Sequence, residues 1–219
     1  MAAIFPSVNH ANEDGLLAVG GSLDVDTLVT AYKSGIFPWP VEDGYPMTWF
    51  APDPRGIIDL KDFKISKSLT KFLKNTNYKV TFNYDFEQII TRCSVIKRKH
   101  ESGTWIYQDI INAYTELFNK GLAYTVAVFE DDNIIGGLYG VCIGELISGE
   151  SMFHKKDNAS KMALVFLIEK LKEKKIQFID TQMVTPVIES FGGKSIDRSE
   201  FMERIEQLDY RRSRKDLFN

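Results

Sequence analysis

The chain has little of what metal-binding, secreted and membrane proteins depend on. Among its 219 residues are only two cysteines, Cys93 and Cys142, which are far apart and sit in apolar patterns, so we expect both to be reduced and structural. Its three histidines are isolated, which argues against a metal site. No apolar run approaches the ~18 residues of a membrane span, and the first residues lack a basic signal region, so we expect a cytoplasmic protein with no membrane partner.

An excess of positive charge is also missing. The formal net charge of −3 argues against a protein that coats nucleic acid through bulk charge, so any RNA contact should be local. Local basic segments do occur at "KFLKN", which follows Lys67, at "KRKH" from residue 97, and at "RRSRK" from residue 211. Each of these runs taken alone is more typical of a solvated surface.

Nucleotide-binding signatures are incomplete. The "GGKS" segment at 192–195 lacks the first glycine of a P-loop, because Ile188 stands in its place, and neither GxGxxG nor GxSxG occurs. The order of elements suits an acyltransferase that uses acetyl-CoA, but such enzymes cradle pyrophosphate in a [QR]xxGx[GA] turn at a helix N-terminus. The corresponding turn here reads "FHKKDN" and has no glycine. No cofactor is therefore expected, although the acyltransferase fold remains possible.

The chain divides by composition near residue 56. Residues 1–56 are rich in Gly, Pro and Trp and contain one clear helical run, for which Asp24 is the predicted N-cap and Gly35 the residue after the end. We expect a small, loop-rich N-terminal domain there. The proline-rich part of this segment reads, taken alone, as a rigid structural loop. Residues 57–219 form the predicted catalytic domain.

Residues 57–219 alternate between helical and strand patterns. Three strand-like runs, "AYTVAVFE", "NIIGGLYGV" and "GELISGES", predict an antiparallel meander, and the glycines of the second indicate a bulge or a close neighbour. A long buried helix from Asn158, the strand "QFIDTQ" and two further helical segments follow. This order predicts an α/β (α+β) fold of the GNAT-like acyltransferase kind, with a mixed, largely antiparallel sheet.

Polar residues meet at the predicted strand ends. Asp180 and Gln182 are two apart on one strand, so their side chains should share a face, and Glu150 ends another strand. A strand end that reaches solvent, or a helix cap, would explain the pair equally well. Convergence of all three groups over an apolar floor would make a ligand site. Trp105 in "GTWI" can be a core residue or part of such a site.

Several of these motifs together resemble the bacterial leucyl/phenylalanyl-tRNA-protein transferase family. Eight segments match in the family's order: "GLLAVGGSL", "AYKSGIFPW", "WFAPDPRG", "SGTWI", "GGLYGV", "GESMF", "NASK" and "IDTQ". They cover most of the chain. The resemblance implies transfer of Leu or Phe, and less readily Met, from aminoacyl-tRNA to the N-terminal Arg or Lys of acceptor proteins, which marks them for N-end rule degradation. It also implies the GNAT-like fold without CoA, and a monomer is the default expectation.

The resemblance assigns roles residue by residue. Asp180 and Gln182 match the catalytic pair and Glu150 a substrate-site carboxylate. The amino-acid pocket and the terminal-adenosine site match Trp39, Trp105, Leu138, Ile147 and Gly149. For tRNA phosphates we expect Lys67, Lys71, Lys97, Arg98 and Lys99. Val187 stands where many members carry His, and Ile147 where an aromatic residue can occur, so the preference between Leu and Phe is left open.

The chemistry needs no strong base. An aminoacyl ester is already activated, and an α-amine with a pKa near 7.7 to 8.0 is partly neutral at cellular pH. We hypothesise that Gln182 accepts a hydrogen bond from the attacking amine, while Asp180 polarises Gln182 and stabilises developing positive charge. Glu150 is the candidate partner of the acceptor's cationic groups or, alternatively, an anchor for the donor. The competing functions are a CoA-dependent N-acetyltransferase and a non-catalytic RNA- or peptide-binding module.

Overall fold

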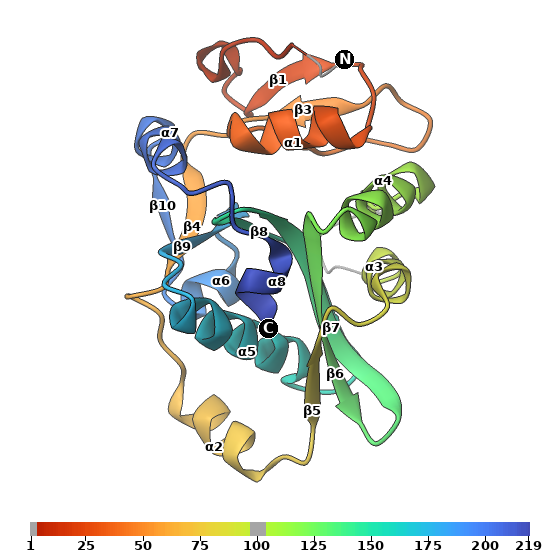
Figure 1. The fold of residues 1–219 in the computed structure, drawn as a ribbon, viewed down its shortest axis with the longest axis vertical. Helices are drawn as coiled ribbons and strands as arrows, with labels where there is room; N and C mark the ends of the chain where they lie inside the picture. Colours follow the sequence, from red (N-terminus) through yellow and green to blue (C-terminus); the bar gives the residue numbers. More distant parts are fainter. Residues whose placement is uncertain (1–3, 97–103) are drawn as a thin grey trace.

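A computed structural model describes residues 4–96 and 104–219, which form two β-sheets with helices around the larger one (Figure 1). The smaller sheet has the strand order β1-β3-β2, and the larger has the order β10-β4-β9-β8-β7-β6-β5. Neighbouring strands in these described ranges run antiparallel except for β8 and β9, which are parallel. The strands are β1 Leu16–Val19, β2 Phe37–Pro38, β3 Thr48–Phe50, β4 Arg55–Asp59, β5 Lys79–Phe82, β6 Ala123–Glu130, β7 Asn133–Ile143, β8 Leu146–His154, β9 Phe178–Gln182 and β10 Lys194–Ile196. The protein therefore has a mixed α/β architecture with a largely antiparallel sheet, as predicted.

The helices begin where capping residues predict. Asp24, Ser66 and Asp85 each accept a hydrogen bond from the backbone N–H three residues further on, and Gly35 follows the first α-helix with a positive φ of 73°. Of the helices in the described residues, none has the length and apolarity needed to cross a membrane. The helices are η1 Val8–His10, α1 Val25–Lys33, α2 Lys67–Asn75, α3 Phe86–Ser94, α4 Gln108–Asn119, α5 Ala159–Glu173, α6 Pro186–Ser190, α7 Arg198–Glu206 and α8 Arg214–Phe218.

Helices cover both faces of the larger sheet, with α3 and α4 on one face and α5 and α8 on the other (Figure 1). Strand β7 is consequently buried along nearly its whole length. Its glycines serve the predicted purposes: a Cβ at Gly136 would lie 2.6 Å from the Ala159 Cβ of α5, and the β7–β8 register shifts at Gly140. The predicted meander is thus confirmed, together with the close neighbour and the bulge.

One apolar core joins the small sheet to the large one. Leu28 of α1 and Trp49 of β3 belong to the same buried cluster as Ile57 of β4 and Tyr114 of α4. A second cluster lies under α5 on the opposite face. Because the first cluster is continuous, the small sheet has a fixed position over one end of the larger sheet, and this position creates the site described below.

Several elements were not predicted from the sequence. The N-terminal segment was expected to be loop-rich, yet it contains β1, β2 and β3, strands of two to four residues that are too short to show a readable alternation. The basic run at 211–215 includes the start of α8. There Arg212 donates to the Lys174 carbonyl (2.9 Å), and Arg214 donates to the Phe118 carbonyl (2.8 Å). Two of these charges therefore hold the C-terminal segment in place.

Candidate active site

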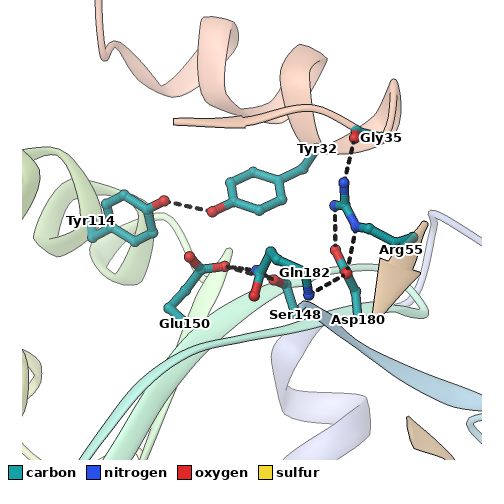
Figure 2. Close-up of polar contacts among 8 residues, drawn as sticks. All are labelled: Tyr32, Gly35, Arg55, Tyr114, Ser148, Glu150, Asp180 and Gln182. Carbon is teal, nitrogen blue, oxygen red and sulfur yellow. Dashed lines mark hydrogen bonds and ion pairs between the residues drawn. The ribbon is translucent and has the colours of Figure 1, made fainter. Parts of the chain in front are cut away.

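The site forms where β8 and β9 diverge. The parallel register joins Ser148 to Asp180, and beyond this point each strand has an extra residue, Glu150 in β8 and Thr181 in β9. Bulges of this kind re-aim the neighbouring side chains. As a result Glu150 and Gln182, which come from different strands, point toward one another (Figure 2).

Gln182 is the central polar group. Its backbone has a φ of 56°, and its side-chain Nε2 donates to Ser148 Oγ (2.7 Å) and to Glu150 Oε1 (3.1 Å). With the amide nitrogen engaged in this way, the carbonyl oxygen is oriented as an acceptor. Gly56 on the adjacent strand allows the turn after Gln182, because a Cβ there would come within 2.5 Å of the Met183 carbonyl carbon.

Asp180 is paired with a buried arginine. Both side chains are almost completely buried, and Arg55 donates from Nε to Oδ1 (2.8 Å) and from Nη2 to Oδ2 (2.7 Å). Asp180 Oδ1 also accepts the backbone N–H of Gln182 (3.0 Å). Asp180 therefore contacts Gln182 through its main chain, whereas the sequence hypothesis required it to polarise the side-chain amide.

Among the residues that the structure describes, the hydrogen-bond donors around Glu150 are neutral. Ser148 Oγ donates to its Oε1 at 2.6 Å, and the Tyr32 hydroxyl also contributes a hydrogen bond. Burial raises the pKa of Glu150 to about 7, an effect that these two hydrogen bonds oppose and that the charge of Asp180 reinforces. Near neutral pH this carboxylate is therefore partly protonated and suited to receive a cation.

Two buried tyrosines complete the polar network. The hydroxyls of Tyr32 on α1 and Tyr114 on α4 lie 2.5 Å apart and face Glu150 (Figure 2). Burial, and then the charge of Glu150, raise the pKa of both phenols well above their usual value. Both tyrosines are thus neutral hydrogen-bonding groups, and through Tyr32 the network links α1 to the large sheet.

A pocket of about 260 Å³ opens beside Gln182 and Glu150. This volume is just below the roughly 300–1,000 Å³ of small-molecule sites. Trp39 and Trp105 form part of an aromatic wall, with ring centroids 6.5 Å apart. An aliphatic wall comes from β7, β8, β9, α5 and α6; it includes Leu138, Met152, Leu164, Leu167, Ile179 and Ile188.

The structure brings together most of the predicted site residues. Six of them line the pocket: Trp39, Trp105, Leu138, Gly149, Glu150 and Gln182. Asp180 lies behind Gln182. Ile147, which was expected to border the substrate, is instead completely buried in the core beneath α5, and Val187 is half-buried without lining the pocket.

The predicted tRNA-binding residues are only partly described. Lys67 and Lys71 are exposed on α2, which lies at the opposite end of the molecule from the small sheet (Figure 1). Lys97, Arg98 and Lys99 fall outside the described residues.

Sequence reasoning missed four members of the polar network: Arg55, Tyr32, Tyr114 and Ser148. One signal was present, because Arg55 is a charged residue directly before the apolar strand "GIID", where a buried side chain needs a partner. The tyrosines gave no signal, since they fit the apolar faces of their helices. In the described part of the chain, no group of three or more His, Cys, Asp or Glu side chains could hold a metal ion.

Comparison with known proteins gives close matches over nearly the whole chain. Relatives named leucyl/phenylalanyl-tRNA–protein transferase include one from Flavobacterium johnsoniae, 46% identical over 90% of this chain and 93% of the relative. Another, from Pseudoalteromonas atlantica, is 45% identical over 93% of this chain and 87% of the relative. A solved structure of a functionally unknown conserved protein from Staphylococcus epidermidis aligns with 6% identity and a TM-score of 0.41, over 83% of this chain and 68% of that one, which is too low to relate the folds.

Family models match in two consecutive parts. Residues 57–206 match the leucyl/phenylalanyl-tRNA protein transferase model, and residues 21–53 match the model of its N-terminal domain. Together with the relatives, these matches show that the chain belongs to the leucyl/phenylalanyl-tRNA protein transferase family, whose members are aminoacyltransferases.

Proposed function

We propose that this chain transfers Leu or Phe, and less readily Met, from aminoacyl-tRNA to the N-terminal Arg or Lys of acceptor proteins. The observation that carries the proposal is the junction of an apolar pocket with the Glu150 carboxylate, whose hydrogen bonds within the described residues come from neutral donors. The product has an N-terminus that the bacterial N-end rule pathway recognises. Because the donor is charged tRNA, the reaction belongs to the cytoplasm, and because one chain builds the whole site, a monomer suffices.

The fold supports a GNAT-like acyltransferase architecture for residues 57–219, with a separate N-terminal domain at 1–56. Parallel strands that diverge beside the site, here β8 and β9, suit an acyl group inserted between them. Support for a division near residue 56 is that the small sheet ends with β3 at Phe50 and the large sheet begins with β4 at Arg55, and that the two family models match 21–53 and 57–206.

The donor fits the apolar part of the pocket. Leu, Phe and Met side chains are apolar, and the aliphatic wall around Leu138 and Ile179 would remove them from water. Trp39 and Trp105 are placed to stack against the terminal adenosine, because aromatic faces bind any base. The ester carbonyl would then lie near Gln182, at the boundary between the apolar and polar walls.

The acceptor fits the polar side. Ionised Glu150 is suited to pair with the Arg or Lys side chain of the acceptor, which would give this carboxylate a cationic hydrogen-bond partner. The neutral α-amine attacks the ester carbonyl carbon; a C–N bond forms, the C–O bond to the ribose breaks, and the amine proton ends on the leaving 3′-oxygen. Gln182 accepts a hydrogen bond from the amine and orients it.

A CoA-dependent acetyltransferase has less support. Acetyl-CoA enzymes present free backbone amides to pyrophosphate at the start of a helix. Before α5 the amides of Lys155 and Lys156 instead donate to the Ile135 carbonyl, and Asn158 begins the helix with no glycine nearby. A non-catalytic binding module would not require Gln182 to be held at a positive φ by hydrogen bonds to Ser148 and Glu150.

A direct assay tests the proposed function. Purified protein is incubated with radiolabelled Leu-tRNA or Phe-tRNA and a peptide that begins with Arg, with a peptide that begins with Asp as the control. We expect label on the Arg peptide alone. Absence of label there, with intact charged tRNA, would contradict the proposal.

Lys67 and Lys71 are proposed to contact tRNA phosphates. Replacing both with Gln should weaken aminoacyl-tRNA binding, and the negative slope of log affinity against log salt concentration should become shallower by about 1.5 because two phosphate contacts are lost. Lys120→Gln, an exposed lysine after α4, is the matched control. An unchanged salt slope in the double variant would place the tRNA elsewhere.

A further inference from the structure

We propose that Arg55 is a positioning residue for aminoacyl transfer, which holds Gln182 and the aromatic wall of the donor pocket as one rigid unit. This inference rests on the proposed transferase function. The Arg55 guanidinium lies at the junction of α1, β2, β4, β9 and α7, so one side chain connects both sides of the site. Figure 2 shows its contacts with Gly35 and Asp180.

The guanidinium of Arg55 is held on every side. Besides its two bonds to Asp180, it donates from Nη1 to the Gly35 carbonyl (2.8 Å). Its Cζ also lies over the rings of Phe37 and Phe201, 4.8 and 4.5 Å from the ring centroids. Arg55 is only 2% exposed. A planar guanidinium that makes three hydrogen bonds and contacts two aromatic rings has a defined orientation, which a lysine cannot reproduce.

On one side Arg55 acts through Asp180 on Gln182. The carboxylate that Arg55 fixes also accepts the Gln182 backbone N–H (3.0 Å). Gln182 has a φ of 56°, a conformation that residues other than glycine adopt at a cost, so contacts from outside the strand must maintain it. The Arg55–Asp180 pair supplies such a contact and thereby sets the direction of the side-chain carbonyl oxygen of Gln182.

On the other side Arg55 fixes the aromatic wall. Gly35 and Phe37 lie four and two residues before Trp39, and both contact the guanidinium. Movement of this segment would therefore change the donor pocket and the acceptor-orienting group together.

The chemical consequence concerns Asp180. The positive charge of Arg55 neutralises it, and its contact with Gln182 is through the backbone. The Arg55–Asp180 pair therefore orients the Gln182 amide rather than polarising it. The transfer rate should depend more on the geometry of the pair than on the charge of Asp180.

The variant Arg55→Lys tests this inference, because it keeps the charge and loses the fork. Its control is Arg204→Lys. Arg204 lies on α7 and pairs with Asp59 (2.6 Å), which is on β4 like Arg55 but away from the pocket. The readouts are thermal unfolding, single-turnover transfer from Phe-tRNA to the Arg peptide at saturating substrates, and tryptophan fluorescence on binding a non-hydrolysable Phe-adenosine amide. We expect a rate about 10–100-fold lower for Arg55→Lys, the size of effect of small misplacements, with altered analogue binding, and a rate within about twofold of wild type for Arg204→Lys.

A cycle with Gln182→Ala separates positioning from stability. If Arg55 acts through Gln182, Arg55→Lys in that background should lower the saturated rate by less than about threefold, because residues that act as a unit are not additive. Phe201→Leu, which removes one face from the guanidinium outside the pocket, should lower the rate in the same direction if Arg55→Lys fails to fold.

Folded Arg55→Lys or Phe201→Leu protein with the wild-type rate and wild-type analogue binding would overturn the inference while leaving the transferase function intact. A wild-type protein that transfers nothing to the Arg peptide would instead overturn the proposed function.

Discussion

The two carboxylates of the site lie on neighbouring strands in opposite surroundings. Asp180 on β9 forms a buried ion pair with Arg55, whereas Glu150 on β8 receives its hydrogen bonds, within residues 4–96 and 104–219, from neutral groups. Burial raises the pKa of Glu150 to about 7. The comparison shows that the environment of a carboxylate decides its role: Asp180 is part of a structural ion pair, whereas Glu150 is free to bind a cationic group of the substrate.

Asp180→Asn should give the largest effect, on stability. It would leave the buried Arg55 without its counter-charge, a change that costs about 3–5 kcal/mol of unfolding free energy. Urea denaturation at pH 8 measures it, with Glu150→Gln as the matched variant, which we expect to lose no stability because it strands no cation. Equal losses in the two variants would remove the distinction between the carboxylates.

Gln182→Ala tests the group that joins the two carboxylates. Loss of the acceptor that orients the amine should lower the single-turnover rate about 10²–10³-fold at saturating substrates. Gln177→Ala, an exposed residue just before β9, serves as the control and should keep the wild-type rate. A wild-type rate in Gln182→Ala would move the orienting role to the substrate or to backbone groups.

The pH dependence of stability gives the smallest effect. The folded pKa of Glu150, about 7, is above its ordinary value of 4.5, so the unfolded chain releases this proton first as the pH rises. The contribution of Glu150 to stability is thus fully present below about pH 4.5 and is lost as the pH rises through 7. Relative to wild type, Glu150→Gln should gain about 3 kcal/mol between pH 4.5 and 8.

Parallel urea titrations across this range measure the difference. Glu173→Gln, which removes an exposed carboxylate on α5, is the control for the effect of losing one negative charge at the surface. A pH-independent difference between Glu150→Gln and wild type would show that the carboxylate does not titrate in this window.

The contrast between the carboxylates could be anticipated only in part. Strand spacing indicated that Glu150, Asp180 and Gln182 converge, and capping residues located α1, α2 and α3. Arg55 was missed because its partner is 125 positions away, and the bulges that aim Glu150 and Gln182 depend on pairing between strands. Such long-range contacts leave no local periodicity in the sequence.

The pocket shows the same limit. Trp39 and Leu138 were assigned through the resemblance to the family, and they line the pocket only because the small sheet packs over the large one. Ile147 shares the strand of Glu150 but faces the core beneath α5. Which face a residue occupies near a bulge cannot be counted along the strand, because each extra residue reverses the alternation.

The central claim is that Glu150 recognises the cationic acceptor residue while Asp180 only positions Gln182. The most direct measurement compares kcat/KM for peptides that begin with Arg and with citrulline, its neutral isostere, at pH 8 in wild type and Glu150→Gln. In wild type, kcat/KM for the Arg peptide should exceed that for the citrulline peptide by about 100-fold, because citrulline leaves the desolvated Glu150 carboxylate without its charged partner. In Glu150→Gln this preference should fall below about tenfold. An Arg preference that is unchanged in Glu150→Gln would contradict the account.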